Sequence, residues 1–148
     1  MKTPPAKQPK IRFTEFNETW SEQALDPYIL ERKEKSTEQN QYRVMTSSNK
    51  GLMWQDDYYG GGRIVERDNV GFNVLPPKFI TYRSRADDRN FTFNINHLGK
   101  TGLISNFYPV FSLREMSSRF LVSLLNCRKH TVGKHSVGTS QTVLSLNA

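Results

Sequence analysis

Hydrophobic residues in the middle of the chain occur in short groups that no helical period connects. Between residues 40 and 111, Gly, Pro, Asn, Asp or Ser separates apolar groups that are mostly two or three residues long. Residues 91–96 alternate apolar and polar positions with a period of two, and residues 79–82 form the next best strand segment. The pattern allows one β-hairpin over about 78–96 within a segment, 40–111, that is otherwise predicted to be irregular.

Helical structure is predicted within the segment 13–39. Thr19 and Glu22 have the spacing of a capping box, in which each side chain bonds the backbone N–H of the other residue. Pro27 interrupts this helix. Asp26 suits the N-cap of a second piece, because proline is best tolerated at the first helical position. We expect an interrupted helix over about 20–35.

A second, amphipathic helix is predicted within the segment 112–128. Ser112 and Glu115 match another capping box. The apolar residues that follow recur at helical spacing and form one stripe, which favours a helix over about 113–127. The stripe consists of Leu113, Met116, Phe120, Leu121, Leu124 and Leu125.

Composition argues for a thin core. The 148-residue chain is 36% hydrophobic, below the roughly 45–50% apolar content of ordinary globular domains, a figure that also counts Gly. Burial then offsets the entropy of chain ordering less easily. We expect a mostly irregular or extended chain with few helices and a small or absent independent core, ordered on a larger partner.

Positive charge gathers at the two ends of the chain. The sequence has 21 Lys and Arg against 14 Asp and Glu, a formal net charge of +7, and its pI is about 9.7. Residues 1–12 form a basic, Pro-rich arm, and residues 129–148 form a basic tail that we expect to be flexible. Such a charge favours an acidic partner, which could be nucleic acid, an anionic membrane surface or an acidic protein lattice.

Cysteine content and hydropathy suggest an intracellular protein. Cys127 is the only cysteine, so no intramolecular disulfide can form, as is usual in reducing compartments. No apolar run approaches the roughly 20 residues that span a bilayer, and residues 1–13 lack the apolar stretch of a secretory signal. We expect a cytoplasmic protein without a membrane partner.

The residues that could carry chemistry do not form a recognisable site in the sequence. The glycines 60–62 lack the strand, helix and Lys-Ser/Thr context of a phosphate-binding loop. Cys127, His130 and His135 have no nearby acid to complete a zinc site. The Asp pairs at 56–57 and 87–88 are interpreted as ion pairs and turn caps rather than acid–base groups. We expect no catalytic residue, cofactor, metal or small-molecule substrate, and hence a protein that is not an enzyme.

Aromatic residues alternate with arginines through the middle segment. Three interpretations are open: a small core with solvated arginines, a protein interface dominated by Trp, Tyr and Arg, or a stacking surface for single-stranded nucleic acid. No RNA-binding motif accompanies the pattern, so we favour the protein interface. Its predicted residues are Trp54, Tyr58, Tyr59, Arg63, Phe72, Phe79, Tyr82 and Arg83.

In organisation the chain resembles the small inner proteins of ciliary doublet microtubules. The matching features are the basic, Pro-rich arm, the segments 47–63 and 72–85, and one strong helix. Residues 86–89 (Ala-Asp-Asp-Arg) followed by Asn94 are similar to a His-Asp-Asn-Arg signature of a sperm and ciliary family, without its His. The resemblance implies a structural protein of the cytoskeleton that stabilises doublets in the axoneme of a cilium or flagellum. Its partners would be the tubulin lattice and neighbouring inner proteins.

The alternative is a peripheral basic subunit of a ribonucleoprotein, such as a mitochondrial ribosome, that binds RNA. Such subunits share the high pI, the extended arms and the sparse core. The sequence leaves both assemblies open.

Overall fold

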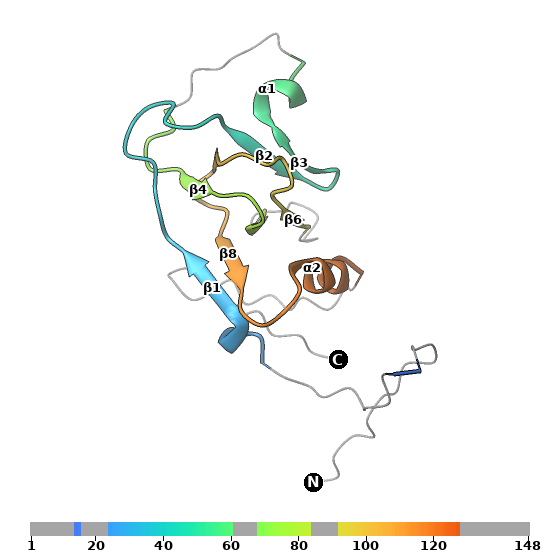
Figure 1. Ribbon diagram of the computed structural model, residues 1–148. Helices are drawn as coiled ribbons and strands as arrows, with labels where there is room; N and C mark the ends of the chain where they lie inside the picture. Colours follow the sequence, from blue (N-terminus) through green and yellow to red (C-terminus); the bar gives the residue numbers. More distant parts are fainter. Residues whose placement is uncertain (1–13, 16–23, 61–67, 84–91, 128–148) are drawn as a thin grey trace.

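The residues described by the structure fold mainly into β-structure. In the computed structural model of the chain they are residues 14–15, 24–60, 68–83 and 92–127. They form eight strands, two α-helices and one 3-10 turn (Figure 1). In chain order the elements are η1 (Asp26–Tyr28), β1 (Ile29–Arg32), β2 (Met45–Ser48), β3 (Gly51–Trp54), α1 (Gln55–Tyr58), β4 (Asn73–Leu75), β5 (Ile80–Tyr82), β6 (Phe93–Ile95), β7 (Gly102–Ile104), β8 (Val110–Leu113) and α2 (Ser118–Cys127).

The strands form three sheets whose strand pairs are all antiparallel. The largest sheet has the order β1-β8-β5-β6, and β2–β3 and β4–β7 form sheets of two strands each. In the largest sheet, Ile29 at the start of β1 lies opposite Leu113 at the end of β8. The neighbouring strands β1 and β8 therefore come from parts of the chain that are far apart in sequence.

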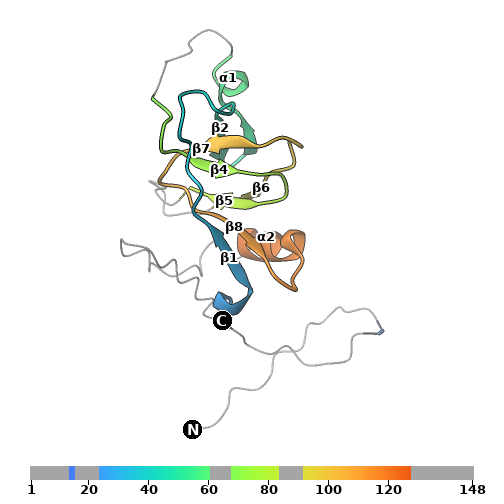
Figure 2. The same cartoon turned by 60° about the vertical axis from the view of Figure 1, so that its left-hand side comes forward.

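Short contacts join the three sheets edge to edge. Lys35, just beyond β1, bridges to the first residue of β4, and Val44, just before β2, bridges to the middle of β7. From β6, the Asn94 side chain donates a hydrogen bond to Ser47 Oγ in β2 at 2.8 Å. Side chains from all three sheets meet in one interior, and Figure 2 shows the strands stacked below α1, with α2 beside β8 and β1.

Two hydrophobic clusters lie on opposite faces of the four-stranded sheet, because successive side chains of a strand point to opposite faces. The helix-side cluster lies between this sheet and α2. It consists of Leu25, Ile80, Tyr82, Phe93, Phe111, Leu121 and Leu125. The inner cluster combines side chains from all three sheets and consists of Met45, Leu75, Ile104 and Val110.

Helix α2 closes the outer edge of the four-stranded sheet. Leu121 and Leu125 are its buried residues. Near its C-terminus, the Asn126 Oδ1 atom accepts a hydrogen bond from the Phe93 N–H at 2.9 Å, and Asn126 Nδ2 donates to the Phe93 carbonyl at 2.9 Å. A single side chain therefore satisfies both backbone groups of Phe93 at the edge of β6, as a further strand would do.

The prediction of a mostly irregular chain with a small or absent core is wrong. Strands β4, β5 and β7 have three residues each, and all of these residues are buried. Strands covered on both faces need not alternate apolar and polar residues, so the period-two pattern did not reveal β4 and β7. The expected hairpin is present as the β5–β6 pair, with Ile80 opposite Ile95. It is one of five strand pairings among the described residues, and its connection, 84–91, lies outside them.

The helix predicted over about 20–35 is wrong for the described part of that range. Asp26–Tyr28 is a single 3-10 turn with Pro27 in it, and the backbone is extended from Ile29 (ψ 127°) through β1. Pairing of β1 with β8 overrides the local helix signals, which are weak relative to tertiary contacts. Thr19 and Glu22 lie outside the described residues, as do the arm 1–12 and the tail 129–148.

The helix predicted over about 113–127 exists, but its predicted start is wrong. Helix α2 spans Ser118–Cys127, and Ser112 lies in β8 opposite Leu30. Glu115 has a φ of 57°, outside the helical range. The cap comes from Ser117, whose Oγ accepts a hydrogen bond from the Phe120 N–H at 3.3 Å. The Ser112–Glu115 spacing is therefore not a capping box.

Candidate binding surfaces

Helix α1 is a single turn that follows the β2–β3 hairpin directly. Trp54 ends β3 in an extended conformation, and the Gln55 N–H donates to the Val44 carbonyl at 3.0 Å. Gly60, which has a φ of 70°, ends the turn in the left-handed conformation that glycine tolerates best. A backbone hydrogen bond therefore holds the start of α1, and Gly60 marks its end.

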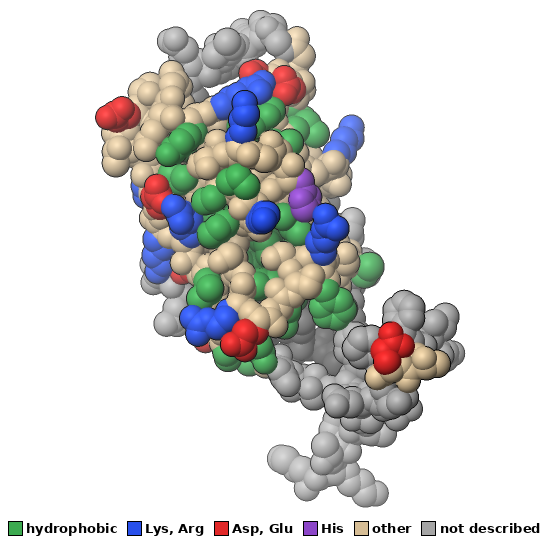
Figure 3. Space-filling model, viewed as in Figure 1, with side chains coloured by type: hydrophobic (Ala, Val, Ile, Leu, Met, Phe, Trp, Pro, Cys, Tyr) green, Lys and Arg blue, Asp and Glu red, His purple; other side chains and the backbone are tan. Residues whose placement is uncertain are grey.

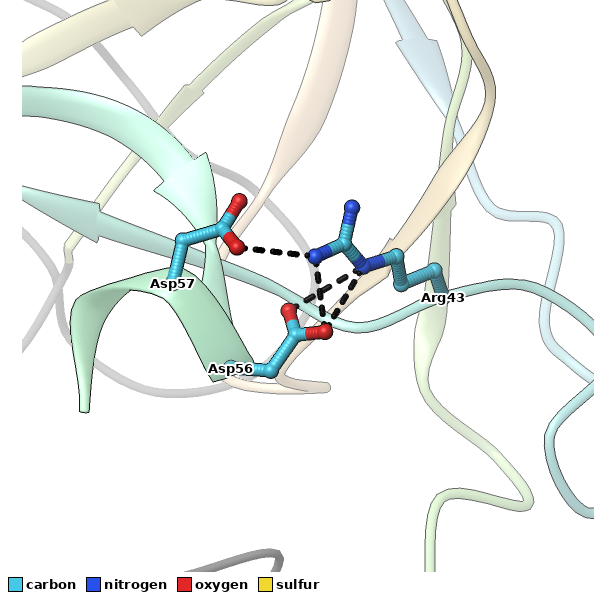
Figure 4. Close-up of polar contacts among 3 residues, drawn as sticks. All are labelled: Arg43, Asp56 and Asp57. Carbon is cyan, nitrogen blue, oxygen red and sulfur yellow. Dashed lines mark hydrogen bonds and ion pairs between the residues drawn. The ribbon is translucent and has the colours of Figure 1, made fainter. Parts of the chain in front are cut away.

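Arg43 ties α1 to the sheet through two carboxylates (Figure 4). Its Nε donates to both oxygens of Asp56 at 3.0 Å, and its Nη2 donates to Asp56 at 2.7 Å and to Asp57 at 3.1 Å. The hydrogen bond from Arg43 lowers the pKa of Asp56, and the same bond raises the pKa of Arg43. The guanidinium carbon also lies 4.8 Å from the centre of the Trp54 ring. These contacts hold the helix, the tryptophan and the arginine in one arrangement.

Two tyrosines project from this turn into solvent. Tyr58 is 46% exposed and Tyr59 is 61% exposed, and their rings make an edge-to-face pair with centres 5.1 Å apart. We call Trp54, Tyr58 and Tyr59 the α1 surface. The structure thus brings together three of the residues predicted to bind a partner.

A second group of predicted residues lines a hollow of about 440 Å³. Its aromatic lining consists of Phe72, Phe107 and Tyr108, and its polar lining consists of Asp68, Arg83, Ser105 and Asn106. We call it the aromatic hollow. Asn73 fixes one wall, because its Nδ2 donates to the Tyr108 carbonyl at 2.7 Å. Phe72 and Arg83, eleven positions apart in the sequence, meet here.

The other predicted interface residues occupy different places. Tyr82 is only 4% exposed, belongs to the helix-side cluster and lies with its ring centre 4.7 Å from that of Phe93. Phe79 is half-buried against the inner cluster, with the Arg32 guanidinium 5.6 Å from its ring centre. The structure thus accounts for Tyr82 as a core residue, and Arg63 lies outside the described residues.

Sequence reasoning did not identify Arg43, Phe107 or Tyr108. Arg43 precedes Asp56 by 13 positions, and no local spacing connects the two residues. A signal did exist for the other two. They lie in the segment Ser-Asn-Phe-Tyr-Pro at 105–109, whose Asn and Pro indicate a turn. Aromatic residues in a turn are good candidates for exposed contacts, and Phe107 is indeed 53% exposed.

The described residues contribute little of the net positive charge of the chain. They contain ten of the 21 Lys and Arg residues and nine of the 14 Asp and Glu residues, which gives +1 out of the total of +7. On the face shown in Figure 3, Lys and Arg side chains are scattered singly or in small groups among hydrophobic ones. The described part of this face therefore has no continuous basic stripe.

Within the described residues, no group of three His, Cys, Asp or Glu side chains could hold a metal ion. The helices in the same part of the chain are all too short or too polar to cross a membrane. Comparisons of the chain with protein-family models, with curated proteins and with solved structures found no match.

Proposed function

We propose that the protein is a non-catalytic binding subunit that docks onto a partner protein through the α1 surface. The observation that carries this proposal is the pair of exposed tyrosines on a turn that Arg43 holds in place. Tyr and Trp supply large contact areas with few side-chain torsions to immobilise, and they are enriched at the energetic centres of protein interfaces. A turn already fixed in the free protein loses little further entropy on binding.

Local charge favours a protein over a nucleic acid at the α1 surface. Arg43 is already engaged by Asp56 and Asp57, so the three groups together carry a formal charge of −1. A phosphate backbone needs several unpaired cations, whereas the described residues carry a net charge of only +1. The exposed tyrosines therefore suit a protein contact better than bases stacked beside phosphates.

Of the two assemblies expected from the sequence, this surface suits the microtubule lattice, which is made of protein. The irregular chain organisation no longer supports that resemblance, because the described residues are mainly β-structure. What supports the proposal is the α1 surface, since the positive charge of the whole sequence suits an acidic protein lattice and a nucleic acid equally. The ribonucleoprotein is the alternative outcome of the test.

The test compares retention of tagged protein on isolated ciliary doublets and on ribonucleoprotein particles over a range of salt concentrations. We expect Tyr58→Ala combined with Tyr59→Ala to weaken retention on doublets by at least about 30-fold, the effect of one hot-spot residue. Phe120→Ala, which removes a ring that is 50% exposed on α2, is the matched control.

Treatment with salt and with nuclease distinguishes binding to doublets from binding to a ribonucleoprotein. An aromatic contact should survive moderate salt, because screening acts mainly on exposed charges. Release by nuclease, or a steep loss of binding with salt in which the tyrosine variant behaves like wild type, would instead assign the protein to the ribonucleoprotein.

A further inference from the structure

Two adjacent turns on one side of the β-structure are held together by a single buried asparagine. The turns are residues 76–79, between β4 and β5, and residues 96–101, between β6 and β7 (Figure 2). We call them the paired turns. Asn96 is 1% exposed, and its Nδ2 donates to the Lys100 carbonyl at 2.9 Å. Its own carbonyl accepts a hydrogen bond from the Lys78 N–H at 2.9 Å. The backbones of both lysines therefore contact one fixed residue.

The paired turns carry cations and no acid. Lys78, His97 and Lys100 are exposed, and neither turn contains Asp or Glu. The turns have a formal charge of +2, whereas all described residues together carry +1, so the other described residues carry −1. The ion pairs among the described residues all lie next to β1 or at α1. Within that part of the chain, the two lysines of the paired turns have no acidic partner.

Lys78 occupies a backbone position that favours glycine. Its φ is 69°, in the left-handed region, and the Phe79 N–H donates to the Pro76 carbonyl at 3.3 Å across the turn. A turn with proline at its second position and a positive φ at its third prefers Gly or Asn at the third. A lysine there is strained, and strained backbone clusters at functional sites. The strain points to a role for the lysine side chain.

Segments outside the described residues attach away from the paired turns. The turns precede β5 and follow β6, two antiparallel neighbours, whereas the connection 84–91 leaves from the opposite ends of these strands. The segment 61–67 precedes β4, and the first turn follows it. The site therefore consists of described residues only.

We infer that the paired turns bind an acidic segment of a partner protein. The ammonium groups of Lys78 and Lys100 pair with its carboxylates, and His97, next to Asn96, adds a hydrogen-bonding imidazole. Because Asn96 fixes both turns in the free protein, little further backbone entropy is lost on binding. The paired turns share no residue with the α1 surface, so the inference does not depend on the proposed function.

The composition of the turns favours a protein over a single-stranded nucleic acid. Sites for single strands combine cations with aromatic rings on which bases stack. The aromatic residue of the paired turns is Phe79, which is half-buried against the inner cluster, with the Arg32 guanidinium 5.6 Å from its ring centre. Carboxylates require only the charges that the two lysines supply. An oligonucleotide is the competing outcome of the experiment.

The experiment is an NMR titration of the ¹⁵N-labelled full chain at low ionic strength. The probes are a short oligoglutamate peptide, an oligoglutamine peptide of the same length and an oligothymidylate of the same charge. We expect oligoglutamate to shift the amide signals of the paired turns with a dissociation constant in the millimolar range, because exposed ion pairs are individually weak. Oligoglutamine should not bind, and added salt should weaken the binding of oligoglutamate.

Three variants locate the site. Lys78→Gly and Lys100→Gln should each weaken oligoglutamate binding about threefold, and together about tenfold. Glycine adopts the φ of Lys78 without strain, so Lys78→Gly should leave the fold intact. The matched control is Lys35→Gln, which removes an exposed lysine opposite Asn73 at the other end of β4. This control should leave binding nearly unchanged.

Several results would overturn the inference. They are shifts that lie outside the paired turns, equal binding of oligoglutamine and oligoglutamate, and no saturable shift in the millimolar range. Equal weakening by Lys35→Gln and Lys100→Gln would mean that net charge, and not this site, attracts the peptide. Equal or tighter binding of oligothymidylate at the paired turns would replace the acidic segment by a nucleic acid. Spectra of each variant show whether it is folded, so a loss of binding cannot be mistaken for unfolding.

Discussion

The two helices lie at opposite ends of the β-structure and differ in how they are held. Helix α2 has ten residues and buries Leu121 and Leu125 against the sheet. Helix α1 has four residues, none of them buried, and depends on Arg43 and a backbone hydrogen bond. A helix fixed by apolar burial contributes to the stability of the whole domain, whereas one fixed by exposed ion pairs contributes little. The α1 end therefore presents side chains, and the α2 end stabilises the fold.

The same contrast separates the aromatic residues. Tyr82 and Phe93 pack together in the helix-side cluster, while Tyr58 and Tyr59 pack together in solvent. Nothing in the residue types distinguishes the two pairs. Changes at the α2 end should affect stability, and changes at the α1 end should affect contacts and local order.

The largest expected effect comes from placing a charge at the α2 end. Leu121 is 1% exposed, and Leu121→Asp would bury an unpaired carboxylate at a cost of several kcal/mol unless it becomes protonated. Because small domains have a total stability of about 5–15 kcal/mol, we expect loss of the cooperative unfolding transition in circular dichroism. Ser123→Asp, at an exposed position of the same helix, is the control and should unfold like wild type. A normal transition for Leu121→Asp would mean that α2 does not pack on the sheet.

A smaller effect is expected from the polar contact at the same end. Asn126→Ala leaves the N–H and carbonyl of the buried residue Phe93 without their partner. We expect the free energy of unfolding to fall by about 1–3 kcal/mol, as measured by denaturant titration. Amide exchange at Phe93 should also become faster. Ser123→Ala removes no contact to Phe93, and because Ala has the higher helix propensity it should not lower the free energy of unfolding. A similar loss in that control would show that the contacts to Phe93 are not responsible.

A gain in stability, opposite in sign to the two losses above, is expected from a substitution in the interior. Thr81 is fully buried, and its hydroxyl has no hydrogen-bond partner among the described residues. Thr81→Val keeps the shape and removes the unpaired hydroxyl, so we expect a gain of about 1 kcal/mol in the free energy of unfolding. Thr46→Val, at a half-buried position of β2, should change stability by less than about 0.5 kcal/mol. A loss of stability in Thr81→Val would mean that the hydroxyl is hydrogen-bonded in solution.

The smallest expected effect is a local structural change at the α1 end when the pH is lowered. Since the hydrogen bond from Arg43 lowers the pKa of Asp56, the contribution of this pair is present above the ordinary carboxyl pKa. It is lost as the pH falls through the lowered value, which lies below about pH 4. Fluorescence of Trp54, measured with Trp20→Phe to remove the other tryptophan, should report release of Arg43 from its ring.

Asp56→Asn tests the assignment of this acid transition. The variant has no carboxylate at that position, so the fluorescence change below about pH 4 should disappear. Asp68→Asn, which removes an acid from the aromatic hollow, should leave it intact. If the change persists in Asp56→Asn, the transition belongs to another carboxylate.

Local sequence predicted the elements whose signals are local. The apolar stripe of α2 includes both of its buried residues, and the alternating residues around Phe93 form β6 as expected. The predicted start of α2 failed, because Ser112 pairs with a strand from the other end of the chain. Short strands buried on both faces, such as Val74 and its neighbours in β4, had no periodicity to reveal them.

The sequence by itself determined the charge, the single cysteine, the α2 stripe and the abundance of aromatic and arginine residues. Only the tertiary structure decided which aromatic residues are buried and which are exposed. It placed Tyr82 in a core and Tyr59 in solvent, and it engaged Arg43 with two acids more than ten positions away. The physical reason is that both a core and an interface favour aromatic residues, because each removes their apolar surface from water. Exposure depends on contacts between distant segments, and these are fixed by strand pairing that local patterns do not encode.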